Sequence, residues 1–189
     1  LLGQTVNSSR YDDMGFVDLL EKVNAIEGLR RIRFTTSHPA DTNERLLFAL
    51  RDLEKVCEQF HLPVQSGSNR ILSAMRRNHT REDYLRIIDR FREIFSGVST
   101  AYQPAISTDL IVGFPGETES DFEETVDLMR RVRWDSAFMF KYSIRPGTYA
   151  ATLSEHLDEE TKARRLARMI ELQHQTSREI NQLLLGETL

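Results

Sequence analysis

The chain has 189 residues, of which 40% are hydrophobic and 29% charged, enough for one globular unit with a real core. Its formal net charge of −4 argues against a general nucleic-acid binder. No stretch approaches the roughly 18 apolar residues of a membrane span, and no signal peptide is visible. The single cysteine, Cys57, excludes an internal disulfide framework and fits a reducing, cytoplasmic compartment.

Strand and helix patterns alternate along the first half of the chain, as in βα units that build a parallel sheet. Leu1–Gln4 resembles the end of a strand, and we expect further sequence before it. A helix over 16–26 ends at Gly28. A strand over 31–36 and a helix over 46–57 follow, and Cys57 is expected on the apolar, packed face of that helix. A short strand over 61–65 and a helix over 70–76 complete this half.

The second half repeats the alternation. Thr80-Arg81-Glu82-Asp83 resembles a capping box and opens a helix that reaches Ile94. A strand over 106–114, a helix capped by Thr118, a strand over 136–142 and a long charged helix capped by Asp158 follow. Because a complete eight-stranded barrel needs roughly 250 residues, these elements predict an α/β fold that is a partial, open barrel. We also expect further sequence after residue 189.

The segment Ser107–Thr118, STDLIVGFPGET, is the most informative part of the chain. It combines a buried strand, a Gly-Pro-Gly turn and a helix cap. Loops that lead from strand to helix hold the active sites of α/β barrels, and glycine there lets a ligand approach the backbone. The alternative is a tight connection that binds nothing.

Similar polar segments rich in small residues follow all the predicted strands. In a parallel α/β sheet these ends meet at one edge, where ligands bind. Ordinary turns also favour such residues, but their consistency at one edge indicates a site. The segments are Gly3–Thr5 with Asn7, Thr35–Pro39, Gln65–Asn69, Gly113–Glu117 and Tyr142–Thr148.

Three side chains near these ends have suitable chemistry. The amide of Gln65 suits ribose hydroxyls or an amino-acid head group. The guanidinium of Arg77 can bind a carboxylate with two hydrogen bonds, although Arg76 and Arg77 could equally form a solvated helix end. Asp109 could accept hydrogen bonds from a diol or simply face water where its strand begins.

Other candidates have a plainer alternative beside the functional one. His38, which precedes a proline, is expected to be structural, and the remaining histidines show no metal-ligand spacing. Phe138, Phe140 and Tyr142 could stack on an adenine, but alternating aromatics in a strand first predict core. Two basic groups could meet RNA phosphates, although solvated surface is the expected role of each: Arg30, Arg31 and Arg33, and Lys162, Arg164, Arg165 and Arg168. No catalytic triad, phosphate loop or carboxylate pair can be assigned.

Taken together, the motifs resemble those of the radical S-adenosylmethionine methylthiotransferases. The similarity covers nearly the whole chain in order, and its second and third motifs are most similar to the branch that acts on N6-dimethylallyladenosine in tRNA. The motifs are LLGQTVNSS (1–9), RIRFTTSHPAD (31–41), HLPVQSGSNRIL (61–72), TDLIVGFPGETESDFEET (108–125) and FKYSIRPGTYAA (140–151).

The resemblance implies an open barrel with S-adenosylmethionine across the strand ends. Gly3 and Gln4 fall where the family contacts the methionine amino group, and Gln65 and Ser66 match a polar position of its fourth strand. Arg77 matches the arginine that pairs with the methionine carboxylate. Two further matches complete the implied cofactor site: Asp109 with a ribose contact, and Val112 and Gly113 with the backbone beside the adenine.

The departures from the family pattern concern the iron–sulfur clusters and the flanking domains. The family's Cys-x3-Cys-x2-Cys motif is absent, and Cys57 alone cannot hold a [4Fe–4S] cluster. The resemblance therefore implies a core domain over 1–185 without its first strand and cluster loop, with 186–189 beginning an RNA-binding domain. Thr5 and Ser9 stand where the family usually has Asn and Tyr.

The resemblance also implies a reaction. Reductive cleavage of S-adenosylmethionine at one [4Fe–4S] cluster would give a radical that removes hydrogen from C2 of the adenine at tRNA position 37. Sulfur from a second cluster, methylated by another S-adenosylmethionine, would then be inserted. A flavodoxin or ferredoxin would supply the electrons, and this segment alone would be inactive. Two alternatives stay open: a methylthiotransferase for threonylcarbamoyladenosine tRNA or a ribosomal protein, and a cluster-free barrel module that binds a nucleotide.

Overall fold

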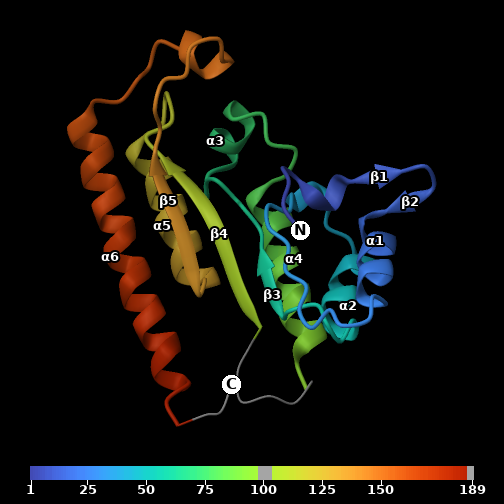
Figure 1. Cartoon of the computed structure of the whole chain (residues 1–189). Helices are drawn as coiled ribbons and strands as arrows, with labels where there is room; N and C mark the ends of the chain where they lie inside the picture. The colour runs from blue at the N-terminus through green and yellow to red at the C-terminus, as the bar shows by residue number, and fades with distance from the viewer. Residues whose placement is uncertain (98–103, 187–189) are drawn as a thin grey trace.

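A computed structural model of the chain describes residues 1–97 and 104–186. Its centre is a sheet of three parallel strands in the order β3-β4-β5 (Figure 1). These strands span Gln59–His61, Ala105–Val112 and Ser136–Lys141. A small antiparallel pair, β1 (Arg10–Tyr11) and β2 (Met14–Gly15), lies apart from this sheet. The parallel βα arrangement confirms the predicted α/β class, and the described residues form no closed barrel.

Helices follow the strands and cover one face of the sheet. In Figure 1, α4 and α5 lie behind the strands, whereas the face toward the viewer carries no helix. The helices are α1 (Phe16–Asn24), α2 (Glu44–Asp52), α3 (Asn69–Ala74), α4 (Arg81–Phe95), α5 (Glu119–Val132) and α6 (Glu159–Leu183). Three short 3-10 turns complete the elements: η1 (Val6–Ser8), η2 (Pro39–Asp41) and η3 (Tyr149–Thr152).

The two faces of the sheet differ in burial because side chains alternate along a strand. On β4, Ile106, Leu110 and Val112 are buried on the helix-covered face, whereas Asp109 and Ile111 are half-buried on the other. The register pairs Asp109 with Phe138 and Ile111 with Phe140. The face without helices, which we call the open face, therefore combines polar and aromatic residues.

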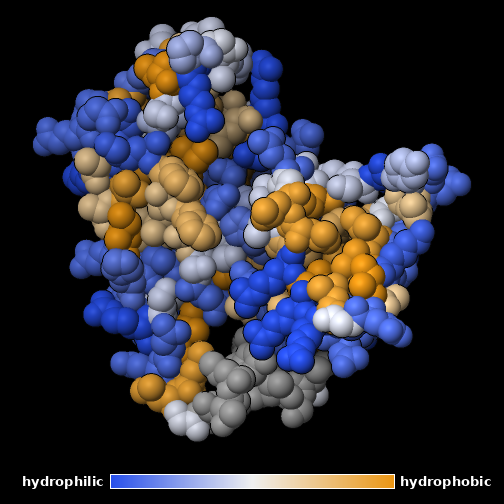
Figure 2. All heavy atoms as spheres, viewed as in Figure 1, coloured by the Kyte–Doolittle hydropathy of each residue, from blue (hydrophilic) through white to orange (hydrophobic). Residues whose placement is uncertain are grey.

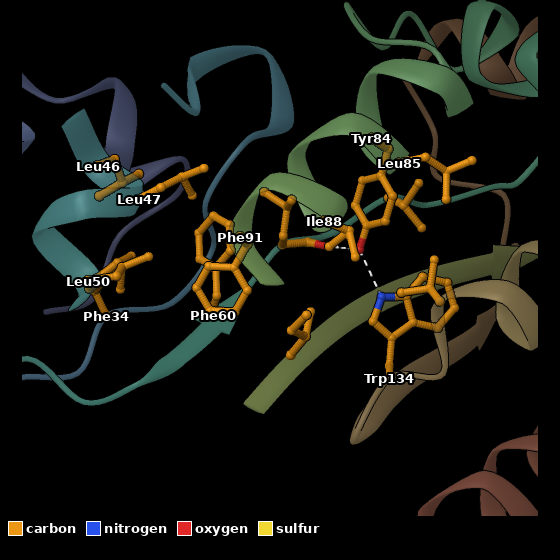
Figure 3. Packing of buried hydrophobic residues seen from close by; sticks show 14 of the residues in the cluster. Phe34, Leu46, Leu47, Leu50, Phe60, Tyr84, Leu85, Ile88, Phe91 and Trp134 are labelled. Carbon is orange, nitrogen blue, oxygen red and sulfur yellow. Dashed lines mark hydrogen bonds between the residues drawn. The ribbon is translucent and has the colours of Figure 1, made fainter. Parts of the chain in front are cut away.

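The core lies between this sheet and the helices (Figure 3). Phe60 and Phe91 pack with ring centroids 5.4 Å apart. Tyr84 on α4 donates its hydroxyl to the carbonyl of Leu62 and accepts a hydrogen bond from Trp134 Nε1, at 3.0 and 2.9 Å. The buried hydroxyl thus links α4 to the segment that follows β3 and to the segment that precedes β5.

Pro63 interrupts the pairing of β3 with β4. Proline has no N–H to give to a strand ladder, and the Thr108 hydroxyl takes its place. The hydroxyl donates to the Leu62 carbonyl at 2.9 Å and accepts from the Val64 N–H at 3.0 Å. Pairing then resumes at Gln65, whose N–H donates to the Asp109 carbonyl at 2.9 Å. The predicted strand over 61–65 is therefore present as extended chain with a break.

Two predictions for the first third of the chain are wrong. The segment over 31–36 forms only one bridge, between Ile32 and Val56, and Leu1–Gln4 forms no strand. Thr36 lies at φ 66°, outside the strand region. The amino group of Leu1 donates to the Arg33 carbonyl and the Val6 N–H to the Thr36 carbonyl, so the two segments still lie side by side.

The helix predicted over 46–57 ends early. α2 stops at Asp52, and Leu53 adopts an extended conformation. The next residues form neither helix nor strand, apart from a single parallel bridge between Val56 and Ile32. Cys57 is therefore not on a helix face, and it is only half-buried because its neighbour Val56 takes the inward position.

The predicted helix starts are confirmed. Thr80 with Asp83 and Thr118 with Asp121 form capping boxes, and Asp158 caps α6 by accepting from Thr161 N–H. Such caps satisfy N–H groups that the helix itself cannot. No helix among the described residues is long and apolar enough to cross a membrane. Of the second domain expected over 186–189, residues 187–189 lie outside the described residues.

The expectation that α6 presents solvated cations is wrong for two of them. Lys162 and Arg165 are buried, because α6 packs against the loop that follows β4. The guanidinium of Arg165 donates to the Glu117 carboxylate at 2.8 Å. The Gly113 N–H donates to the same carboxylate at 2.5 Å. Burial raises the pKa of Glu117, although these two contacts act to lower it. Arg164 stays exposed, as expected, and Arg168 is half-buried; both are paired with acidic residues.

Candidate functional site

A cavity of about 590 Å³ lies at the carboxyl ends of β4 and β5, beside the end of α3. Three of the five polar strand ends contribute to it, those after β3, β4 and β5. Its size is that of a pocket for a small organic ligand or cofactor. Its lining consists of Gln65, Ala74, Met75, Arg76, Arg77, Asp109, Ile111, Phe114, Phe140, Lys141, Tyr142, Ser143, Arg145, Thr148, Tyr149 and Ala150.

Gln65, Arg77 and Asp109, which the sequence singled out, all line this cavity. They come from three different places: the extended segment after β3, the turn after α3, and the middle of β4. Asp109 is not at the entry of its strand, and its side chain is 28% exposed. The fold therefore gathers a carboxamide, a guanidinium and a carboxylate around one space.

Gln65 adopts an unusual backbone conformation, with φ at 74°. A residue other than glycine is seldom found there, and the conformation costs about 1–3 kcal/mol. The surrounding sheet holds it: its N–H donates to the Asp109 carbonyl and its carbonyl accepts from the Ile111 N–H, both at 2.9 Å. Strain held in this way is typical of ligand-binding positions.

Arg77 is half-buried, and it forms no ion pair with any carboxylate in the described part of the chain. Burial lowers the pKa of its guanidinium, while the charge of Asp109 acts in the opposite direction. A partly buried guanidinium without a close partner is suited to an anionic ligand group, above all a carboxylate.

Aromatic residues form the other side of the cavity. Phe114 and Tyr142 pack edge to face, with centroids 5.3 Å apart, and Arg76 lies over the Tyr149 ring at 4.0 Å. The Tyr142 hydroxyl is buried and has no hydrogen-bond partner among the described residues. Phe140 is 54% exposed and Phe138, one pair further down the open face, is 56% exposed.

The expectation that Phe138 and Phe140 are core is therefore wrong. They point to the open face of β5, where no helix covers them. Apolar surface gathers over β5 in Figure 2. A flat ligand group has aromatic neighbours available on this side of the site.

The other predicted cofactor residues do not line the cavity. Ser66 is buried, where its hydroxyl contacts Thr125 at 3.4 Å and accepts from the Ser68 N–H at 3.2 Å. Val112 is core, and Gly113, at φ 75°, packs under Lys162, where a Cβ would lie 2.2 Å from Cγ. Gly3 and Gln4 are exposed in the segment over 1–4, which forms no strand. Their roles toward a cofactor stay predictions.

The polar segments over 3–7 and 35–39, which were predicted to follow strands that do not form, contact each other. The Asn7 side chain donates to the His38 carbonyl at 2.9 Å and accepts from the His38 N–H at 2.7 Å. The His38 ring lies 5.6 Å from that of His79. His38 thus has the structural contacts expected of it.

Burial and nearby positive charge act on both histidines. Burial lowers the pKa of His79 to about 4, helped by His38 and Arg77. Burial and Arg77 also lower the pKa of His38, with Asp41 opposing. Both rings are therefore neutral around pH 7.

Sequence reasoning missed several residues of the site. Tyr149 and Arg76 reach the cavity because the chain after β5 returns over the end of α3, which no local pattern reveals. His61 lies below Asp109, with its Nε2 3.6 Å from Asp109 Oδ1. The alternation of His61 with Leu62 along a strand could have placed it on the open face.

The comparisons with known proteins bear on this geometry. The sequence profile of the radical SAM superfamily matches residues 7–129. The chain belongs to the radical SAM superfamily. One solved structure, the coproporphyrinogen III oxidase HemN from Escherichia coli, described as a radical SAM enzyme, aligns with a TM-score of 0.60 at 19% identity. The alignment covers 76% of this chain and 32% of that one, and it supports the open-barrel fold.

Closer relatives confirm the resemblance stated from the motifs. The chain is 52% identical over 190 residues to the tRNA-2-methylthio-N6-dimethylallyladenosine synthase of Caldicellulosiruptor saccharolyticus, covering 99% of this chain and 39% of the relative. The synthase of Thermoanaerobacter sp. is 53% identical, and the match covers 99% of this chain and 39% of the relative. The synthase of Syntrophomonas wolfei is 52% identical, and the match covers 98% of this chain and 41% of the relative. The chain thus spans about two fifths of the length of these relatives.

The superfamily implies S-adenosylmethionine and an iron–sulfur cluster, and the residues present fit the first. The cavity offers a carboxylate, together with a guanidinium and the Tyr142 hydroxyl that have no partner among the described residues. The cluster does not fit: the chain holds one cysteine, and its described residues contain no group of three possible metal ligands. Cluster ligands are several thiolates, so the residues described cannot hold a cluster by themselves.

Proposed function

We propose that this chain is the cofactor-binding part of an enzyme that methylthiolates C2 of N6-dimethylallyladenosine at position 37 of tRNA. The observation that carries the proposal is the convergence of Gln65, Arg77 and Asp109 on one cavity at the strand ends. The relatives named as synthases of this modification match the chain from end to end, which supports the choice of reaction.

Each of the three side chains has a distinct role in this proposal. Arg77 binds the methionine carboxylate of S-adenosylmethionine, because its guanidinium is half-buried and pairs with no carboxylate of residues 1–97 or 104–186. Asp109 accepts hydrogen bonds from the ribose hydroxyls, and the Gln65 amide binds polar groups between these two. Phe140 and Tyr142 shield the bound molecule from water.

The remaining predicted contacts concern the backbone and the first strand end. Val112 and Gly113 would present main-chain atoms to the adenine, and Gly3, Gln4 and Ser66 would complete the site around the methionine group. Glu117 accepts from the Gly113 N–H and from Arg165 on α6, and these contacts hold the loop at Gly113 in place. When bound, S-adenosylmethionine supplies the radical chemistry, and the protein supplies binding and orientation.

The whole enzyme would have further parts and partners. We infer that residues 1–185 are part of its core domain, that an RNA-binding domain begins at 186–189, and that two [4Fe–4S] clusters are held by other segments. Its partners would be tRNA and an electron donor such as a flavodoxin or ferredoxin, in the cytoplasm. Arg31 and Arg33 are exposed and form no ion pair with another described residue, so they are available to RNA.

Mass spectrometry of tRNA nucleosides tests the reaction. A deletion strain should lack 2-methylthio-N6-dimethylallyladenosine and accumulate the form without the methylthio group, and the whole gene should restore it. The gene with Arg77→Ala should restore about a tenth or less, whereas Arg86→Ala, on the exposed side of α4, should restore it fully. Loss of methylthio-threonylcarbamoyladenosine instead, or an unmodified ribosomal protein, would contradict the proposed substrate.

A further inference from the structure

One titratable side chain near the cavity has no role in the function proposed above. His61 is buried on the open face at the end of β3, with its side chain 10% exposed, and it does not line the cavity. Its Nδ1 lies 2.9 Å from the Ser107 hydroxyl, and its Nε2 lies 3.6 Å from Asp109 Oδ1. It thus touches the residue proposed to bind ribose.

The surroundings fix the orientation of this ring. The Phe138 ring packs edge-on against His61 with centroids 6.1 Å apart. The register of β3 and β4 pairs His61 with Ser107, which places the serine hydroxyl beside Nδ1. A ring held by a sheet, an aromatic edge and a hydroxyl has little freedom to turn.

The contacts also select one tautomer. A neutral imidazole carries one proton, and a bare Nε2 lone pair facing a carboxylate would be repelled. The arrangement without repulsion has the Ser107 hydroxyl donating to Nδ1 and the Nε2–H directed toward Asp109. The remaining lone pairs of the Asp109 carboxylate are then free for a ligand above it.

We infer that His61 is a positioning residue for S-adenosylmethionine: through Nε2–H it holds the Asp109 carboxylate in the orientation that binds the ribose hydroxyls. This inference rests on the proposed function, because it requires Asp109 to contact the cofactor. Ser107 acts one step further away by fixing the tautomer. Neither residue contacts the cofactor itself.

Two substitutions separate this role from packing. The amide nitrogen of His61→Gln reaches about as far as Nε2 and can still donate to Asp109. The shorter amide of His61→Asn reaches only the position of Nδ1 and keeps the contact with Ser107. If His61 acts by packing or through the Ser107 contact, His61→Asn should keep more of the affinity for the cofactor. If it acts through Asp109, His61→Gln should keep more.

Calorimetric titration of the chain with S-adenosylmethionine tests the inference. We expect His61→Asn to weaken binding about tenfold, because the contact of Nε2 with the Asp109 carboxylate is lost, and His61→Gln to retain affinity within about threefold. The double variant His61→Asn with Asp109→Ala should bind no more weakly than Asp109→Ala alone. Circular dichroism checks that each variant folds.

Three results would overturn the inference. Wild-type affinity in His61→Asn, or losses that add in the double variant, would show that His61 does not act through Asp109 while the proposed cofactor site stands. No binding by the wild-type chain would overturn the cofactor site and the inference together. If His61→Asn does not fold, Ser107→Ala replaces it: a loss of affinity supports the role, and unchanged affinity overturns it.

Discussion

At the scale of single residues, the site consists of groups kept in unfavourable surroundings. Gln65 has a backbone conformation that costs free energy, Arg77 is half-buried without an ion-pair partner, and the Tyr142 hydroxyl is buried without a hydrogen bond among the described residues. Other buried polar atoms without a partner among the described residues belong to Ser37, His79 and Arg165. The three groups named first are set apart because they line one cavity, which is the pattern expected of a ligand site.

His79 makes stability depend on pH. Its pKa is lowered to about 4 in the folded chain, chiefly by burial, while an unfolded histidine titrates near 6.5. Between these values the unfolded chain binds the additional proton, so the free energy of unfolding must fall as pH falls from about 6.5 to about 4. The largest possible loss is about 3 kcal/mol.

Urea unfolding at several pH values measures this dependence. His79→Gln removes the titrating group and should flatten the curve between about pH 6.5 and 4. The control is His174→Gln, on the exposed side of α6, which should leave the curve unchanged. An equally steep curve in His79→Gln would show that other groups cause the acid sensitivity.

At the scale of elements, helix starts could be predicted and strand extents could not. The caps at Thr80, Thr118 and Asp158 depend on residues within one turn, so the sequence contains the whole signal. Whether 31–36 becomes a strand depends on a distant partner, and Val56 pairs there at one position only. The break at Pro63 needed the Thr108 hydroxyl, which lies on another strand.

The same distinction applies to the site. Gln65, Arg77 and Asp109 stood out by motif and chemistry, and the fold gathers them. Tyr149 and Arg76 could not be placed in the cavity from the sequence, because their position depends on how the chain after β5 crosses α3. Ser66 shared the polar character of its neighbours, but contacts to Thr125 on α5 turn its hydroxyl inward.

Gly67 controls how closely the loop before α3 approaches α5. A Cβ at this position would lie 2.5 Å from both the Glu124 carbonyl oxygen and Thr125 Cα. Backbone atoms cannot move aside as a flexible side chain can, so Gly67→Ala should cost about 3 kcal/mol of stability. Urea unfolding followed by Trp134 fluorescence measures the loss. Gly15→Ala, whose Cβ would be 3.5 Å from its nearest neighbour, should cost far less, and equal losses would contradict this account.

Tyr84 joins α4 to the sheet through its hydroxyl. Tyr84→Phe leaves the Trp134 N–H without its acceptor and the Leu62 carbonyl without one of its donors, all buried. Leaving buried groups unsatisfied should lower the free energy of unfolding by about 1–3 kcal/mol. Circular dichroism is the suitable measurement because Trp134 itself is affected. Tyr11→Phe, at a residue 72% exposed, is the matched control, and a loss as large there would argue against the hydrogen bonds as the cause.

At the scale of the whole molecule, the fold separates stability from binding. Helices α4 and α5 cover one face of the sheet and form the core (Figures 1 and 3). The open face and the strand ends hold the polar and aromatic groups that the core does not use. Substitutions at the site are therefore expected to change binding more than stability, and those at Gly67 or Tyr84 the reverse.

The central claim is that the cavity at the strand ends binds S-adenosylmethionine. Calorimetric titration of the chain with S-adenosylmethionine tests this claim most directly. The variants are Arg77→Ala and Asp109→Ala. Arg86→Ala is the control, because it changes the charge by the same amount as Arg77→Ala. We predict binding by the wild type and by Arg86→Ala, weakened at least about tenfold in the other two. No binding by the folded wild-type chain, or equal affinity in all four proteins, would contradict the account.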